Sequence, residues 1–100
     1  MVSWWKAAPV ATPRRAGHVE GILGSYRWEA FLARAPVSYG LDTATLYKGS
    51  GRIVRLALYA RLPGTRLWRK VAAYHRGWLF GRRRYLDVLR RVVDEIEAVG

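Results

Sequence analysis

Three consecutive arginines, Arg82, Arg83 and Arg84, form the densest group of chemically active side chains in the sequence. They follow Gly81 at the point where a run with helical periodicity begins, so the sequence predicts that they occupy the first turn of a helix. Backbone N–H groups at a helix N-terminus bind anions, and guanidinium groups strengthen such a site for phosphate. Gly81 is an acceptable N-cap that leaves those donors open. The spacing therefore favours a phosphate-binding cluster here.

A structural explanation of the same arginines stays open. Positive charge at a helix N-terminus costs about 0.3–1 kcal/mol per residue at low salt, so the arrangement opposes the helix dipole. Arginine is nevertheless a good helix former, and Arg90 or Arg91 can pair with Asp87 or Asp94. The functional hypothesis predicts that replacing all three arginines by alanine preserves or slightly raises the melting temperature while it abolishes binding.

The charge of the whole chain also favours an anionic partner. The net charge is +11, and residues 51–84 carry ten basic residues and no acid. Such an uneven distribution is typical of proteins that bind polyanions, and a solvated basic surface is the alternative. The further predicted anion contacts are Arg76, Arg69, Lys70, Arg66, Arg55 and Arg61, with Tyr59 as a stacking residue.

Groups that could perform catalysis are sparse. The sequence has no cysteine, and its two histidines are His18 and His75. His75 could form an acid–base pair with Asp42 only if the loop that contains Asp42 folded over it. Glu29 is expected to form an ion pair with an arginine across the predicted sheet. No glycine-rich phosphate loop, nucleophile elbow or metal-ligand pair occurs. The sequence therefore predicts a protein that is not an enzyme and needs neither cofactor nor metal.

Two parts of the chain differ in composition. Residues 1–17 form a basic arm that contains Pro9 and Pro13, and its Trp4-Trp5 pair is expected to dock either on the rest of the chain or on a partner. Residues 18–100 are expected to form a single α+β domain. No apolar run reaches the roughly 18–20 residues that a membrane span needs, and the expected location is the cytoplasm.

Hydrophobic periodicity predicts the elements that position the candidate residues. Residues 18–24 and 25–33 alternate around a Gly24-Ser25 turn and indicate a hairpin. Residues 35–51 are rich in glycine, serine and threonine and indicate a long connection. Two further strands, 51–62 and 67–75, flank the Pro63-Gly64 turn, and a helix is predicted over 82–98.

The predicted order is β-β-loop-β-β-α, an α+β fold with an antiparallel sheet of about four strands and one C-terminal helix on one face. The other face is left for water or a partner, and Arg55, Tyr59 and Arg61 are expected there, together with Ile53. For residues 74–78, the sequence allows a turn at Gly77 that buries Trp78 beneath the helix. It also allows an aromatic platform for a base.

The order of several short segments resembles a family of small domains encoded by bacterial phages, prophages and other mobile elements. The segments are VEGILGSYRWEA (residues 19–30), SYGL (38–41), GRIVRLALY (51–59) and VAAYHRGW (71–78), the last followed by a helix. In that family an aspartate usually occupies the position of His75. The resemblance implies a viral or mobile-element origin and a compact α+β fold, and it implies no reaction.

These observations lead to one expected function and two alternatives. The first is a small, non-enzymatic accessory protein in a bacterial host that binds nucleic acid or another polyanion through backbone phosphates. The second is a phage-encoded inhibitor whose basic face docks on an acidic surface of a bacterial defence or nucleic-acid-handling complex. The third is a sponge for a small signalling nucleotide, which requires a pocket in place of an open basic stripe.

Overall fold

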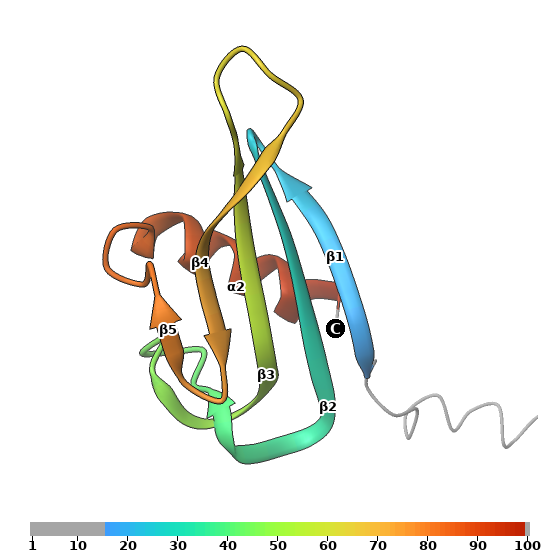
Figure 1. The fold of residues 1–100 in the computed structure, drawn as a ribbon. Coiled ribbons are helices and arrows are strands. Elements are labelled where there is room, and N and C mark those ends of the chain that lie inside the picture. Colours follow the sequence, from blue (N-terminus) through green and yellow to red (C-terminus); the bar gives the residue numbers. More distant parts are fainter. Residues whose placement is uncertain (1–15, 100) are drawn as a thin grey trace, which may run out of the picture.

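The computed structural model describes residues 16–99, which form a five-stranded antiparallel sheet with one helix across one face (Figure 1). The strands lie side by side in chain order: β1 (Gly17–Leu23), β2 (Tyr26–Leu41), β3 (Lys48–Arg61), β4 (Trp68–His75) and β5 (Trp78–Phe80). The helix, α2 (Leu86–Val99), follows β5. The predicted α+β class and the single covered face are confirmed, and the sheet has one strand more than predicted. Trp4 and Trp5 of the predicted arm lie outside the described residues.

The core lies between α2 and one face of the sheet. Alternation along β2 turns Trp28, Ala30 and Leu32 toward the helix, as the sequence predicts, and all three are buried. Their partners in the core include Leu56, Leu58, Leu89, Val92, Val93 and Ile96. Burial of this apolar surface is the main force that holds the helix on the sheet.

Ile53 departs from the predicted alternation. Phe31 pairs with Arg55, but the next residue of β2, Leu32, pairs with Ile53, so Val54 is an extra residue in β3. Such a bulge reverses which side chains face the core. Ile53 therefore points into the core and is fully buried, and its predicted place on the open face was wrong.

The predicted long connection over residues 35–51 is mostly strand. β2 continues to Leu41 and β3 begins at Lys48, so the loop between them covers only residues 42–47. A Cβ atom on Gly40 would overlap the carbonyl of Gly51, and one on Gly51 would overlap the carbonyl of Leu41. The glycines that indicated a loop instead allow two irregular strand ends to approach each other closely.

The helix begins one turn later than predicted. Residues 82–85 form a turn closed by the Tyr85 N–H, which donates to the Gly81 carbonyl at 3.1 Å, and α2 begins at Leu86. Gly81 has a positive φ of 86° and ends β5 instead of capping the helix. The first turn of α2 contains Asp87, which suits the positive end of the dipole. The prediction that the three arginines occupy the first helical turn was wrong.

Candidate nucleic-acid interface

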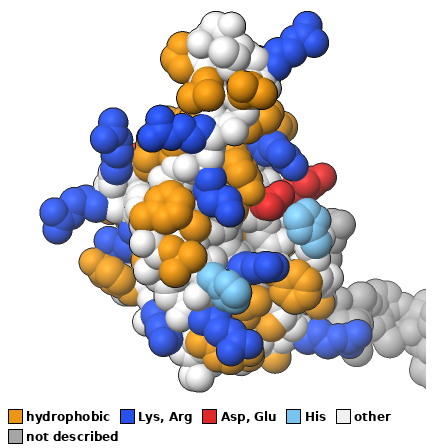
Figure 2. All heavy atoms as spheres, in the orientation of Figure 1, with side chains coloured by type: hydrophobic (Ala, Val, Ile, Leu, Met, Phe, Trp, Pro, Cys, Tyr) orange, Lys and Arg blue, Asp and Glu red, His pale blue; other side chains and the backbone are white. Residues whose placement is uncertain are grey.

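The face of the sheet opposite α2 is uncovered by any other described element and faces the viewer in Figure 1. Lysine and arginine side chains gather over it around a hollow, with both histidines beside them (Figure 2). Strand register arranges its side chains in rows that cross the sheet. One row joins His18, Phe31, Arg55 and His75, because each pairs with the next on the neighbouring strand.

Two more rows complete this surface. The second row joins Glu29, Ala57 and Ala73 on β2, β3 and β4, and the third joins Arg27, Tyr59 and Lys70 on the same strands. The middle row has small side chains at Ala57 and Ala73, whereas both flanking rows have large ones. The result is an open depression of about 270 Å³, here called the alanine groove, with the first row as one wall and Lys70 of the third row on the other side.

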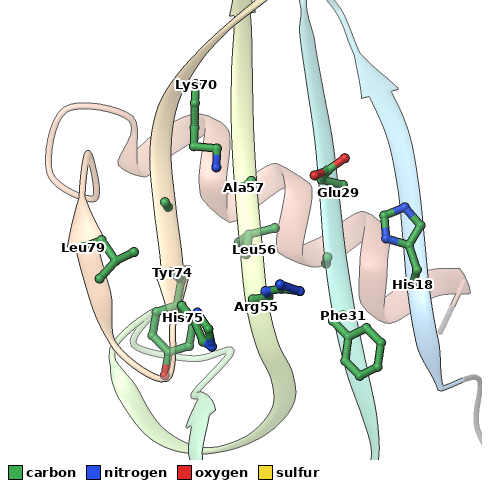
Figure 3. Close-up of a pocket in the computed structure, with 12 residues that line it drawn as sticks. His18, Glu29, Phe31, Arg55, Leu56, Ala57, Lys70, Tyr74, His75 and Leu79 are labelled. Carbon is green, nitrogen blue, oxygen red and sulfur yellow. The ribbon is translucent and has the colours of Figure 1, made fainter.

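Figure 3 shows how the walls of the alanine groove are built. Arg55 and Lys70 lie on opposite sides of Ala57, and Glu29 lies at the β2 end. Leu79 of β5 stands at the other end and is 65% exposed, and Phe31 is 44% exposed. An open basic surface that also exposes large apolar groups is typical of a binding face, because neither feature stabilises an isolated domain.

Tyr59 connects the cations of this face to its acids. Its ring centroid is 5.5 Å from the Arg27 guanidinium carbon and 5.8 Å from the Lys70 amine, within the range of cation–π attraction. Its hydroxyl donates to Glu29 Oε1 at 3.1 Å. Burial, and then this hydrogen bond to a carboxylate, raise the pKa of Tyr59 above its ordinary value of 10.0. The ring is therefore held in place.

The acids of the open face occupy its β1–β2 side. Glu20 and Glu29 are directly paired across the strands, an arrangement that like charges make unfavourable. The Arg27 guanidinium relieves it, since Nη2 lies 3.5 Å from Glu20 and 3.6 Å from Glu29. The hydrogen bond with His18, opposed by burial, and the charge of Arg27 lower the pKa of Glu20. Glu29 thus pairs with an arginine along its own strand, not across the sheet.

The same acids form the one group in residues 16–99 whose geometry suits a metal ion. Ligand atoms of His18, Glu20 and Glu29 lie within 4.8 Å of one another. Arg27 already lies within ion-pair distance of both carboxylates, so their positions are explained without an ion. The sequence did not reveal this group, because only the register of β1 and β2 brings its members together.

Arg82 is placed differently from its two neighbours. Its Nε donates to the Leu46 carbonyl at 2.8 Å and its Nη2 to the Thr45 carbonyl at 2.9 Å. The guanidinium carbon also lies 3.5 Å from the centroid of the Tyr47 ring. These contacts tie the turn before α2 to the loop of residues 42–47, so the Arg82 guanidinium faces the protein.

Two other side chains hold the same loop. Arg90 donates to the carbonyls of Thr43 and Ala44 at 3.1 and 3.0 Å, and not to Asp87 or Asp94. The Trp78 indole N–H donates to the Leu46 carbonyl at 2.7 Å. Trp78 packs against the core, in agreement with the prediction of a turn at Gly77 that buries this side chain.

The remaining predicted contacts lie in three different places. Arg55, Lys70 and Arg61 lie on the open face, and the Arg61 guanidinium carbon is 5.1 Å from the Trp68 ring centroid. Arg76 lies 4.5 Å over the Tyr39 ring in the β4–β5 turn, where its φ is 61°. The others lie exposed away from the alanine groove, in turns or on the opposite side of β4: Arg66, Arg69, Arg83 and Arg84. The structure therefore does not bring all the predicted arginines together.

No protein-family model matches this chain, and no curated protein or solved structure matches it either. Within residues 16–99, α2 is too short and too polar to cross a membrane.

Proposed function

We propose that this protein binds nucleic acid through its backbone phosphates, with the open face of the sheet as the principal contact. The observation that carries the proposal is the position of Arg55 and Lys70 on opposite walls of the alanine groove. Neither side chain forms a hydrogen bond or an ion pair with another residue in 16–99, so both are available to phosphate oxygens.

The charges around these two residues support the same function. β3 and β4 contain no carboxylate, and Arg61 extends the cationic surface along β3. Uncompensated cations on one face raise the local concentration of a polyanion and release its counterions on binding. Contacts with phosphate alone carry no sequence information, so binding is expected to depend weakly on sequence and strongly on salt.

The test is a titration of labelled single-stranded and duplex DNA and RNA by fluorescence anisotropy, at about 50 and 200 mM salt. We expect the double variant Arg55→Ala with Lys70→Ala to reduce the slope of log affinity against log salt by roughly 1.4–1.8. The control, Arg83→Ala with Arg84→Ala, removes the same charge from the turn before α2.

The two variants separate the competing positions of the site. A larger loss of nucleic-acid affinity in the Arg83/Arg84 variant would place the principal phosphate site at the turn before α2. Equal losses of affinity in the two variants would mean that total charge alone determines affinity. Absence of binding by the unaltered protein to all four nucleic acids would overturn the proposal and favour an inhibitor that docks on an acidic protein surface.

A further inference from the structure

The alanine groove has properties that phosphate binding alone does not explain. Its floor consists of Ala57 and Ala73, which pair across β3 and β4. Its volume of about 270 Å³ approaches the lower end of the roughly 300–1,000 Å³ that small-ligand pockets have. A larger residue at either alanine would fill the hollow, so the space depends on these two small side chains.

The walls of the groove differ in chemistry from one end to the other. Glu29 lies at the β2 end, Lys70 lies on β4, and the Arg55 side chain extends from β3 toward β2 (Figure 3). A phosphate is attracted to the two cations and repelled by the carboxylate. The exposed Phe31 ring lies on β2 beside Arg55, and the exposed Leu79 side chain lies on β5 at the other end, so both supply apolar surface. An occupant therefore needs an anionic end, a flat apolar body and a hydrogen-bond donor for Glu29.

We propose that the alanine groove accepts one unpaired nucleobase, which stacks on Phe31 and donates to Glu29 while its phosphates contact Arg55 and Lys70. This inference rests on the proposed nucleic-acid function and names the form of nucleic acid bound. A base in a duplex is stacked on both sides and has its pairing edge occupied, so only a single strand can place a base in the groove.

The Glu29 carboxylate also selects among the bases. An ionised carboxylate only accepts hydrogen bonds, and each oxygen offers more than one acceptor position. Glu29 Oε1 already accepts from Tyr59 and Oε2 lies 3.6 Å from Arg27, which fixes the orientation of the carboxylate and leaves acceptor positions open. Guanine presents two adjacent donors on its pairing edge, its ring N–H and its amino group, and matches the two oxygens. We expect guanine to be preferred to thymine.

The test compares three labelled DNA probes of about 12 nucleotides: oligothymidine, the same strand with one central guanosine, and a mixed-sequence duplex. The variant Ala57→Leu fills the groove without a change of charge. It is expected to weaken binding of the guanosine strand about tenfold or more, and to weaken duplex binding clearly less, because it removes no charge. The control Ala35→Leu adds the same apolar bulk at an exposed position of β2 that does not line the groove.

Two further variants test the base site independently if the Ala57→Leu protein does not fold. Phe31→Ala removes the exposed stacking surface and is expected to weaken single-strand binding selectively. Glu29→Gln is expected to bring the ratio of guanosine-strand to oligothymidine affinity to about one, because its amide presents a donor beside its remaining acceptor. This ratio is unaffected by the general gain in phosphate affinity that loss of a negative charge causes.

The outcomes distinguish this inference from the function on which it rests. If Ala57→Leu and Phe31→Ala weaken single strand and duplex equally, or weaken neither, the base site is overturned. Loss of binding to both in the Arg55/Lys70 variant would then still support phosphate binding. If the unaltered protein binds none of the three probes, the proposed function fails together with the base site.

Discussion

Arg82 and Arg83 are neighbours with the same charge, but their side chains have different surroundings. The Arg82 guanidinium donates to two carbonyls of the 42–47 loop and stacks on Tyr47. Arg83 is exposed and forms no side-chain hydrogen bond or ion pair within residues 16–99. The predicted triple cluster therefore combines Arg82, which stabilises the fold, with the exposed Arg83 and with Arg84, whose guanidinium carbon lies 5.9 Å from the centroid of the Tyr85 ring.

The first prediction concerns these two arginines. Arg82→Ala should reduce the free energy of unfolding by about 2 kcal/mol, since it removes charged hydrogen bonds to two carbonyls and a cation–π contact. Arg83→Ala should change it by less than about 0.5 kcal/mol. Chemical denaturation of both variants measures the difference. Equal stability of the two would show that the Arg82 contacts contribute nothing.

The second prediction concerns Tyr59 at high pH. Because the pKa of Tyr59 is raised in the folded protein, the unfolded chain loses this proton first as pH rises. Its contribution to stability is thus complete below about pH 10 and is lost as pH rises toward the folded-state pKa. Tyr59→Phe should make the loss of stability between about pH 9 and 11 shallower. Denaturation at several pH values tests this, and an unchanged slope would contradict it.

At the scale of elements, Gly81 decides where the sheet ends and the helix begins. Its positive φ turns the chain out of β5, and a Cβ atom there would overlap the Val71 carbonyl of β4. The following turn carries Arg82 to the loop, and only then does α2 begin at Leu86. The conflict with the helix dipole predicted at the N-terminus is therefore absent, whereas the acidic Glu97 remains in the last turn of α2.

The third prediction compares two glycines with similar backbone angles. Gly64 has a φ of 72° and open space around its missing Cβ, whereas Gly81 has both a positive φ and a crowded site. Gly64→Ala should destabilise by about 1 kcal/mol through backbone strain alone. Gly81→Ala should reduce the free energy of unfolding by clearly more, because the new Cβ atom would also force the chain at Gly81 away from the Val71 carbonyl of β4. Thermal unfolding of the two variants provides the comparison, and similar melting temperatures would argue against close packing at Gly81.

At the scale of the whole molecule, the two faces of the sheet have separate roles. One face packs against α2 and contains most of the fully buried side chains. The other exposes Phe31 and Leu79 beside unpaired cations, an arrangement that stability does not require. Substitutions on the two faces should consequently affect different properties of the protein.

The fourth prediction tests this division with one substitution on each side of the sheet. Leu89→Ala, in the core contact of α2, should reduce the free energy of unfolding by about 2–5 kcal/mol, because Leu89 is fully buried. Phe31→Ala should reduce it by less than about 1 kcal/mol and should instead weaken nucleic-acid binding. Denaturant unfolding and anisotropy titration of both variants are needed. A large stability loss in Phe31→Ala would assign that ring to the fold.

The amino-acid sequence by itself determined the class of fold, the first hairpin, the β3–β4 turn and the apolar stripe of the helix, because these depend on residues that are close in the chain. It also placed Arg55, Tyr59 and Arg61 on one face of a strand. Only the tertiary structure decided the bulge at Val54, the engagement of Arg82 by a loop 36 residues away, and the rows that form the alanine groove. Each of these depends either on strand register or on backbone carbonyl groups. Every residue has a carbonyl group, so neither feature can be predicted from the periodicity of the side chains.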